Sequence, residues 1–207
     1  LAQSSFNKSL IQLQECRLAD ESEEKLQNDF LLKIYLNLAI CYNKMNMPLR
    51  ACSMCNEYNK IFSVWKNWKI LFQNAKALVM IGEFEESRKK LVRAQKLNPH
   101  SDEIKNFIQM LDAKKIVWQK YQVELSKFIN DEVKNDETLK RLGKEVELLC
   151  MSLKADTELN RFTINLPSKL SYDELQLIKE IVKKEHFLLE LKENDVHKSI
   201  SITISKT

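Results

Sequence analysis

The chain has very few residues that interrupt regular secondary structure. Its 207 residues include two glycines and three prolines. A β-rich fold needs tight turns at short intervals, and such turns draw heavily on these two residue types. Their scarcity, with 44% hydrophobic and 30% charged residues, excludes a turn-rich β architecture and predicts a mostly α-helical chain. The five residues are Gly82, Gly143, Pro48, Pro99 and Pro167.

Long apolar runs and a large charge excess are also missing. No segment approaches the roughly 20 apolar residues that span a bilayer, and the first residues do not form a signal peptide. The formal net charge is +4 and basic residues are mixed with acidic ones, so composition alone does not indicate nucleic-acid binding. We predict a soluble cytoplasmic protein with no membrane partner. Because the chain begins with Leu1, we expect a fragment of a longer protein.

Recognisable metal and catalytic sites are absent from the sequence. Cys52-x-x-Cys55 has the spacing of half a zinc site, but no second pair follows and the three histidines lie far away. No nucleophile–base pair and no phosphate-binding loop appears. We therefore predict no metal, no cofactor and no enzymatic activity. Reduced core thiols are expected at Cys16, Cys41, Cys52, Cys55 and Cys150.

What the chain does have is an internal repeat. The segment around Ala39 recurs 36 residues later around Ala75, and Ala51 recurs as Ser87. Small residues therefore recur where two helices would cross. The tetratricopeptide repeat (TPR), a helix-turn-helix unit, has a period of about 34 residues. The sequence predicts a TPR array with a two-residue insertion at Phe62–Lys66.

Apolar spacing gives the expected helices of this array. An incomplete first repeat is predicted at Ser5–Leu18, a second at Phe30–Met45 and Pro48–Phe62, and a third at Lys66–Ile81 and Glu83–Leu97. The acidic segment Ala19–Asn28 is either a solvated loop or the first turns of the next helix.

A long apolar stripe follows the third repeat. Ser101 is a good N-cap, and apolar residues continue at helical spacing from Ile104 to Phe128. We expect this helix to cap the open end of the array. Trp118 and Phe128 near its far end leave an independent partner site as the alternative.

The pattern changes after about Asn130. A helix at Glu137–Leu153 is followed by strand-like alternation at Arg161–Pro167, and Ser171 begins another helix. Two further strands are predicted at Phe187–Leu191 and Ser199–Ser205. We therefore predict two domains, with the TPR array and its capping helix at 1–135 and a small α+β domain at 136–207.

A candidate binding site lies on the first helices of successive repeats. Lys33 and Asn37 are four residues apart and share a helix face, and one repeat later Lys69 and Gln73 occupy the same two positions. In a superhelical array these helices line the concave groove. Lys66 and Lys76 extend the positive stripe. Ammonium groups and amide donors suit a carboxylate or an acidic peptide, although simple solvation of the lysines is an equal alternative.

Two segments resemble a known family. Leu36–Tyr42 and Ser87–Lys96, with the long helix after Pro99, resemble the TPR domains of FKBP-type immunophilin co-chaperones. The resemblance covers about Ser5–Ile129 and is greatest to the inactive germline members. Such domains hold the C-terminal Met-Glu-Glu-Val-Asp of heat-shock protein 90 in a two-carboxylate clamp.

The resemblance implies roles for individual residues. The family clamp has a Lys and an Asn on the first helix, an Asn on the third, and a Lys and an Arg on the fifth. Asn37 matches the third-helix Asn and Lys69 the fifth-helix Lys, whereas Gln73 replaces the Arg. Glutamine donates hydrogen bonds but carries no charge, so one bidentate charged contact is lost. The first-helix pair has no counterpart in this chain.

The C-terminal region resembles a small nucleic-acid-binding domain named for an Arg-x-x-x-His motif. The resemblance lies in the topology, because Leu175 and Lys179 stand in place of the Arg and His. RNA could contact the lysines here, but we favour a scaffold or protein-docking role. The candidate RNA-binding residues are Lys169, Lys179, Lys183 and Lys184.

Together these patterns and resemblances predict a non-catalytic co-chaperone. The expected partners are the tail of heat-shock protein 90 and, through the germline resemblance, Piwi-class Argonaute client complexes in transposon silencing. An RNA-binding or scaffolding adaptor that acts through the α+β region is the alternative.

Overall fold

The computed structural model describes residues 2–18, 20–61, 67–130, 136–166, 170–194 and 199–206. The chain divides into two compact units, Leu1–Leu111 and Asp112–Thr207. The division falls inside a long helix, whereas the sequence placed the domain boundary at 135/136. The physical reason is that the two halves of this helix contribute side chains to different cores.

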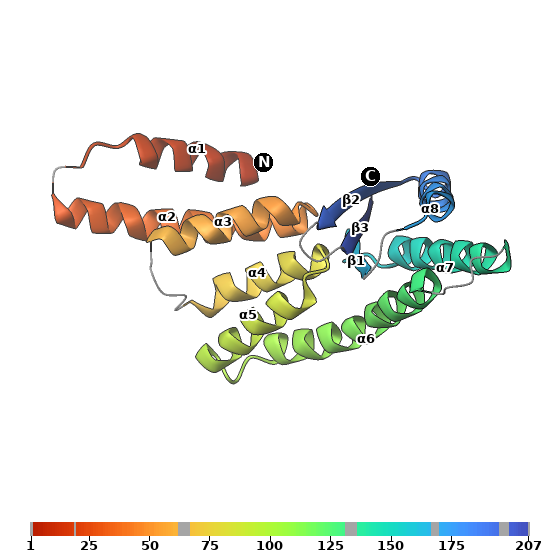
Figure 1. Cartoon of the computed structure of the whole chain (residues 1–207). Coiled ribbons are helices and arrows are strands. Elements are labelled where there is room, and N and C mark those ends of the chain that lie inside the picture. Colours follow the sequence, from red (N-terminus) through yellow and green to blue (C-terminus); the bar gives the residue numbers. More distant parts are fainter. Residues whose placement is uncertain are drawn as a thin grey trace. The chain divides into compact units, whose positions relative to one another are not determined.

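Unit 1 is an array of antiparallel helices (Figure 1). From α1 to α5, each helix packs against its neighbour in sequence. The predicted mostly α TPR-type fold is confirmed. The helices are α1 (Ala2–Glu15), α2 (Glu21–Lys44), α3 (Pro48–Ile61), α4 (Trp68–Met80), α5 (Phe84–Leu97) and the first turns of α6 (Asp102–Asn130).

The acidic segment before the second repeat belongs to α2. The side chain of Asp20 caps this helix by accepting a hydrogen bond of 2.9 Å from the backbone N–H of Glu23. Glu21, Glu23 and Glu24 then lie in the first turn, where carboxylates favour the positive end of the helix dipole. Of the two alternatives for this segment, the structure supports the early helical turns.

The repeat is reproduced in the backbone of the two inter-helix turns. Asn46 has φ 58° and Gly82, 36 residues later, has φ 80°, so both lie in the left-handed region. The N–H after each of them donates back across the turn: Met47 to the carbonyl of Tyr42 and Glu83 to that of Leu78, both at 2.9 Å. Asparagine and glycine are the residues that adopt this conformation most readily, which explains their place in the repeat.

The small repeat residues lie where helices cross, as predicted. Their side chains are fully buried, with 0% exposure at each position. The hydroxyl of Ser87 also donates a hydrogen bond of 3.0 Å to the carbonyl of Ala75, which joins α5 to α4. A larger side chain at these crossings would force the helices apart. The fully buried set is Ala39, Ala51, Cys55, Ala75, Ser87 and Ala94.

The stripe on α6 serves two cores. In unit 1, Ile104 and Leu111 are buried, and the ring of Phe107 packs edge-on against Phe72 with centroids 5.4 Å apart. This part of α6 caps the array as expected. In unit 2, Trp118 is buried and its ring lies 4.8 Å from that of Phe162. The side chain of Phe128 lies outside those described.

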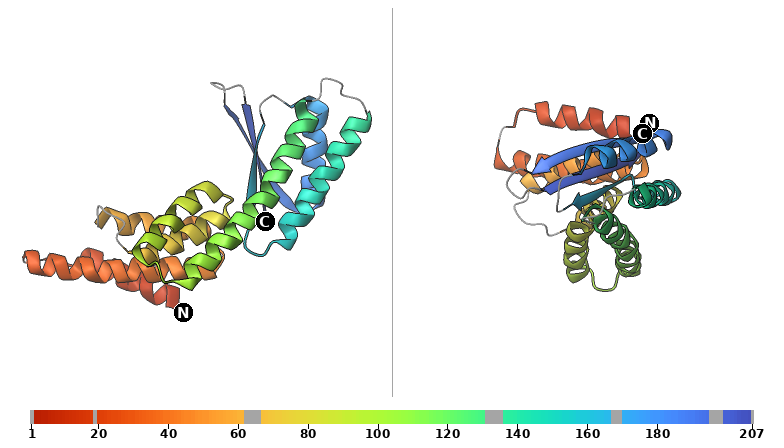
Figure 2. Two further views of the ribbon diagram at one scale, coloured as in Figure 1. Left: turned by 90° about the horizontal axis from the view of Figure 1, so that it is seen from below. Right: turned by 45° about the vertical axis from the view of Figure 1, so that its right-hand side comes forward.

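Unit 2 is an α+β unit with one three-stranded antiparallel sheet in the order β1-β3-β2. The second half of α6, α7 and α8 lie on one side of the sheet (Figure 2, left). The elements after α6 are α7 (Asp136–Ala155), β1 (Arg161–Leu166), α8 (Tyr172–Lys184), β2 (Phe187–Asn194) and β3 (Ser199–Lys206). Pro167 lies outside the described residues.

Strand alternation sets the two faces of this sheet. Every second residue of β1 and β3 is buried beneath the helices, and the residues between them are hydroxyl and amide side chains such as Thr163 and Thr203. Ser171 begins α8 as predicted, with a capping box in which Ser171 and Glu174 bond to each other's backbone N–H. The buried strand residues are Phe162, Ile164, Leu166, Ile200, Ile202 and Ile204. In the described parts of the chain, no helix combines the length and apolarity that a membrane span needs.

Candidate peptide-binding groove

The helices that carry the candidate groove residues, α2 and α4, run parallel. Helix α3 lies between them in sequence. The thiol of Cys55 faces the carbonyl of Ile70, and three residues later the hydroxyl of Tyr58 accepts a hydrogen bond of 3.1 Å from Asn67, three residues before Ile70. Helix α3 therefore runs antiparallel to α4. A tight turn also makes α2 antiparallel to α3. Helices α2 and α4 are therefore parallel, and residues at the same height along their axes can lie side by side.

A polar pair joins α2 directly to α4. The amide nitrogen of buried Asn43 donates to the backbone carbonyl of Gln73 at 2.9 Å and to its side-chain oxygen at 3.0 Å. Asn37 lies six residues before Asn43, and Lys69 lies four residues before Gln73. Because both helices rise about 1.5 Å per residue, Asn37 comes to the level of Asn67, the N-cap of α4, and lies about 3 Å along the axis from Lys69.

Lys69 is placed by a helix cap. Asn67 is the N-cap of α4, and its side-chain oxygen accepts a hydrogen bond of 2.9 Å from the backbone N–H of Lys69. The same amide donates to Tyr58 through its nitrogen, so the cap is fixed from both ends. The Lys69 side chain is exposed, with its ammonium 5.8 Å from the centre of the Trp68 ring. A fixed backbone with an exposed ammonium is suited to receive an anionic ligand.

The other candidate residues differ in how available they are. Lys33 is exposed, 5.4 Å above the ring of Phe30, and Asn37 is half-buried. Lys76 is engaged, because its ammonium lies 3.2 Å from a carboxylate oxygen of Glu103 and 4.4 Å from the centre of the Phe72 ring. Lys66 lies outside the described residues.

Gln73 offers a different group from the arginine it replaces. Its side-chain oxygen is occupied by Asn43, so its amide N–H₂ is the part that remains for a ligand. The other end of the same pair is incomplete, because the side-chain oxygen of Asn43 is buried and has no hydrogen-bond partner within the described structure. An arginine at position 73 has no side-chain oxygen to accept from the Asn43 amide nitrogen. If the Asn43 amide rotated by half a turn, the arginine could instead donate a hydrogen bond to the Asn43 side-chain oxygen.

Sequence reasoning missed three supporting residues. Asn67 carried a signal, because an asparagine directly before a helix is a common N-cap. Asn43 and Glu103 carried none, since their partners lie 30 and 27 residues away and follow no helical spacing.

Comparison with known proteins bears on this region. No protein-family model matches the chain. It is 36% identical over 107 residues to the Drosophila melanogaster "inactive peptidyl-prolyl cis-trans isomerase shutdown", covering 52% of this chain and 24% of the relative. The Bombyx mori protein of the same name is 32% identical over 183 residues, covering 84% of this chain and 40% of the relative.

The chain is a relative of the shutdown immunophilins. It spans less than half the length of these two relatives, 24% and 40%. Both are named inactive isomerases, in agreement with the prediction of a non-catalytic protein. The immunophilin resemblance seen in the sequence is thereby confirmed.

A solved structure supports the fold alone. The myosin chaperone UNC-45 of C. elegans, in complex with an Hsp90 peptide, matches 89% of this chain and 21% of its own with a TM-score of 0.51 at 16% identity. UNC-45 thus shares a helical-repeat fold with this chain, so the fold is not confined to immunophilins.

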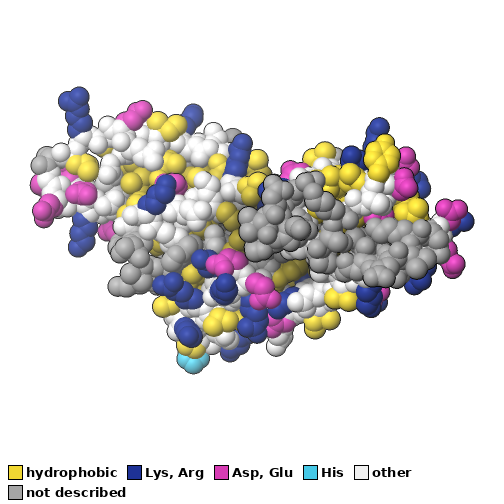
Figure 3. Space-filling model, viewed as in Figure 1, with side chains coloured by type: hydrophobic (Ala, Val, Ile, Leu, Met, Phe, Trp, Pro, Cys, Tyr) yellow, Lys and Arg dark blue, Asp and Glu magenta, His cyan; other side chains and the backbone are white. Residues whose placement is uncertain are grey.

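Three of the four candidate RNA-binding lysines of unit 2 lie on α8. Lys179 and Lys183 are exposed on α8, whereas the ammonium of Lys184 lies 3.5 Å from a carboxylate oxygen of Glu147 on α7. Lys169 lies outside the described residues. On the face of the protein in Figure 3, basic side chains are interspersed with acidic ones. This pattern offers no continuous positive surface there for a nucleic acid.

The two cysteines of the Cys52-x-x-Cys55 pair differ in burial, since Cys52 is partly exposed and Cys55 is not. Cys55 is fully buried in the core of unit 1, and burial raises the pKa of its thiol to about 12. The thiol therefore stays protonated at neutral pH, whereas a metal ligand must be a thiolate.

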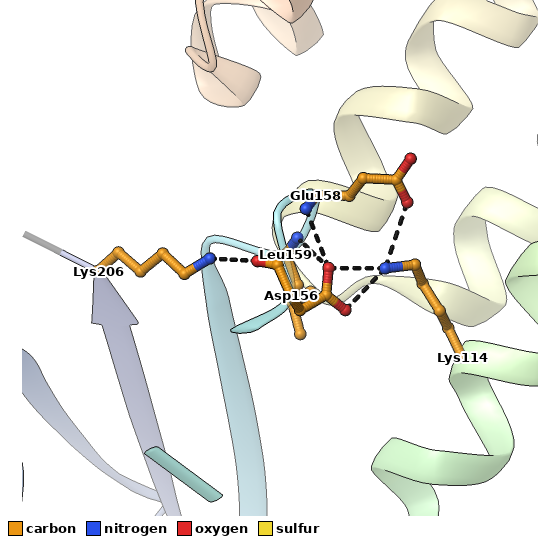
Figure 4. A network of polar contacts seen from close by, with 5 residues as sticks. All are labelled: Lys114, Asp156, Glu158, Leu159 and Lys206. Carbon is orange, nitrogen blue, oxygen red and sulfur yellow. Dashed lines mark hydrogen bonds and ion pairs between the residues drawn. The ribbon is translucent and has the colours of Figure 1, made fainter. Parts of the chain in front are cut away.

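A network of ion pairs and hydrogen bonds in unit 2 has a structural role (Figure 4). Asp156, after α7, accepts two hydrogen bonds of 2.7 Å from the ammonium of Lys114 on α6. It also accepts from the N–H groups of Glu158 and Leu159 at 2.9 and 3.0 Å. The ammonium of Lys206 at the end of β3 donates to the Asp156 carbonyl. The network thus joins α6, the loop before β1, and β3.

The network sets a pH dependence of stability. Burial alone would raise the pKa of Asp156, but the hydrogen bonds from Lys114 and the two N–H groups outweigh it and lower that pKa below the ordinary 3.8. The stabilisation is therefore present above pH 3.8 and is lost as the pH falls through the lower folded-state pKa. We expect Asp156→Asn to lower the free energy of unfolding by about 1.5–3 kcal/mol at pH 7. Denaturant unfolding of both proteins from pH 7 to pH 2 measures this, and a difference that does not narrow in acid would contradict it.

Proposed function

We propose that this chain is the TPR region of a non-catalytic co-chaperone whose groove holds the acidic C-terminal tail of heat-shock protein 90. The observation that carries the proposal is that Asn37 and Lys69 lie within one helical turn of each other along two parallel helices. An amide and an exposed ammonium at that distance can bind the oxygens of a terminal carboxylate. Gln73 adds a neutral N–H₂ donor one helical turn further on.

The relatives extend the proposal to a cellular role. By its likeness to the inactive shutdown isomerases, the whole protein would join heat-shock protein 90 to Piwi-class Argonaute loading and transposon silencing in the germline. In this role the TPR region recruits the chaperone, and no bond is made or broken by the chain.

Capture of the chaperone itself tests the proposal. Immobilised chain should retain full-length heat-shock protein 90 and should not retain the same protein without its last five residues. Equal retention of both forms would place the chaperone contact elsewhere. Retention of neither would remove the chaperone from the proposal.

Gln73→Arg should increase the affinity for the tail. The arginine places a charged fork where Gln73 presents one neutral N–H₂ group, and charged hydrogen bonds are about twice as strong as neutral ones. We expect a roughly tenfold tighter complex in calorimetry. Unchanged affinity would show that the peptide does not reach the second turn of α4.

A further inference from the structure

The two edges of the sheet in unit 2 are treated differently by the fold. On the β1 edge, the side chain of Gln122 on α6 donates to the carbonyl of Asn165 and accepts from its N–H at 3.0 Å. These two bonds occupy the outward backbone groups of Asn165, so another strand cannot pair at that residue of the β1 edge. On the opposite edge, no described residue pairs with the outer side of the eight-residue strand β2. An open strand edge is a template for another strand.

The pairing pattern shows which backbone groups of β2 face outward. Since Asn165 bonds outward to Gln122, its opposite residue Ser201 must direct its N–H and C=O away from β1 and toward β2. Ser201 lies opposite Lys192 in β2. Lys192 and, two residues earlier, Glu190 therefore bond to β3.

The intervening residues then face the free edge. Leu189 and Leu191 direct their N–H and C=O groups outward. A second hydrogen bond agrees with this assignment. The N–H of Lys206 donates to the carbonyl of Asn160 at 2.8 Å, so the even-numbered residues of β3 bond toward β1 and the odd-numbered ones, including Ser201, bond toward β2.

The side chains along this edge carry complementary charges. Glu190 and Lys192 are exposed on the polar face of the sheet, and neither makes an ion pair with a described residue. Between them Leu191 is on the opposite face and remains 38% exposed at the end of the core. Leu188, on the polar face, is 55% exposed.

Only one nearby two-fold register satisfies these charges. A two-fold axis at Glu190 or at Lys192 would place like charges directly opposite each other, which is destabilising. An axis at Leu189 would place Glu190 opposite Leu188. An axis at Leu191 places each Glu190 opposite a Lys192, in the non-hydrogen-bonded pairs whose side chains approach most closely. It also puts the two Leu191 residues opposite each other, with their outward N–H and C=O groups in mutual hydrogen bonds.

We propose that β2 pairs antiparallel with β2 of a second copy of this chain about a two-fold axis at Leu191. The two sheets then form one six-stranded sheet, β1-β3-β2 continued by β2-β3-β1 of the partner. Each chain contributes the same surface, as a closed two-fold dimer requires. The Leu191 pair buries the apolar end of both cores. This interface is separate from the peptide groove and does not rest on it.

Sedimentation equilibrium of the full chain over a concentration series tests the register. Glu190→Lys and Lys192→Glu each place two pairs of like charges in the interface, and each should raise the dimer dissociation constant by roughly tenfold or more. The double variant exchanges both charges and should dimerise like the wild type. Mixing the two single variants should give a heterodimer, because both facing pairs become complementary across the two chains.

Matched controls separate the register from net charge. Glu180→Lys and Lys179→Glu make the same charge changes on exposed positions of α8 and should leave dimerisation unchanged. A wild-type chain that stays monomeric at all concentrations would overturn the proposal and leave the edge to an extended segment of another protein. A dimer that both single variants retain, or that mixing does not restore, would also overturn it.

Discussion

Trp118→Ala is expected to destabilise unit 2 by about 3–5 kcal/mol, the cost of removing a large aromatic side chain from a core. Trp118 is 3% exposed, and its ring contacts Phe162 of β1 at 4.8 Å between centroids. It also lies 5.6 Å from Tyr121, whose hydroxyl bonds to Ser152 of α7. The variant therefore removes a buried ring contact between α6 and β1 and the neighbour against which Tyr121 packs.

Native-state hydrogen exchange measures this change in each unit separately. Protection of the β1 and β3 amides should fall by roughly two to three orders of magnitude. Protection in α4 and α5 should change little if the cores are distinct. Ile116→Ala is the matched control, because Ile116 lies two residues away on the same helix and is 69% exposed. An equal loss in α4 and α5 would show that the two units unfold as one.

Lys69→Ala should weaken binding of the acidic peptide by roughly ten- to a hundredfold. The change removes one charge-assisted contact, worth about 1.5–3 kcal/mol, from the residue that the Asn67 cap holds in place. Lys96→Ala, at an exposed position on α5, removes the same charge and should leave affinity unchanged. Calorimetric titration of each variant gives both values.

The groove model also ranks the other lysines. Lys76→Ala should weaken binding less than Lys69→Ala, because Lys76 already bonds Glu103. If Lys96→Ala and Lys69→Ala weaken binding equally, the attraction comes from net charge and not from a site.

The fold of unit 1 was predictable because its signals are local and repeated. Ala39 and Ala75 recur at the same crossing, and the turns at Asn46 and Gly82 use residues that adopt positive φ. Within each repeat, partners lie close in sequence. Such patterns can be read without knowing the tertiary structure.

The parts that sequence did not reveal depend on contacts between distant residues. The apolar stripe of α6 keeps helical spacing from Ile104 to Leu125 on both sides of Lys114 and Lys115, so the spacing alone does not say that one half packs in each unit. The bond of Asn43 to Gln73 likewise needs the relative depth of α2 and α4. The same holds for Lys76, which was placed on the binding stripe although its ammonium is engaged by Glu103.

The open edge of β2 follows from the order of the strands in the sheet. The alternation of apolar and polar residues along each strand does not predict that order. The strands Phe187–Asn194 and Ser199–Lys206 could be located approximately from their apolar residues. That β3 is central, and that Gln122 bonds to the β1 edge, required the paired structure.

The most direct test of the groove is a calorimetric titration of the wild-type chain with Met-Glu-Glu-Val-Asp in two forms. One form ends in a free carboxylate, and the other ends in a carboxamide of the same sequence. Asn37 and Lys69 are proposed to bind the terminal carboxylate, so the free acid should bind at least tenfold more tightly than the amide. Equal affinity of the two forms, or no heat of binding with either, would contradict the proposed groove.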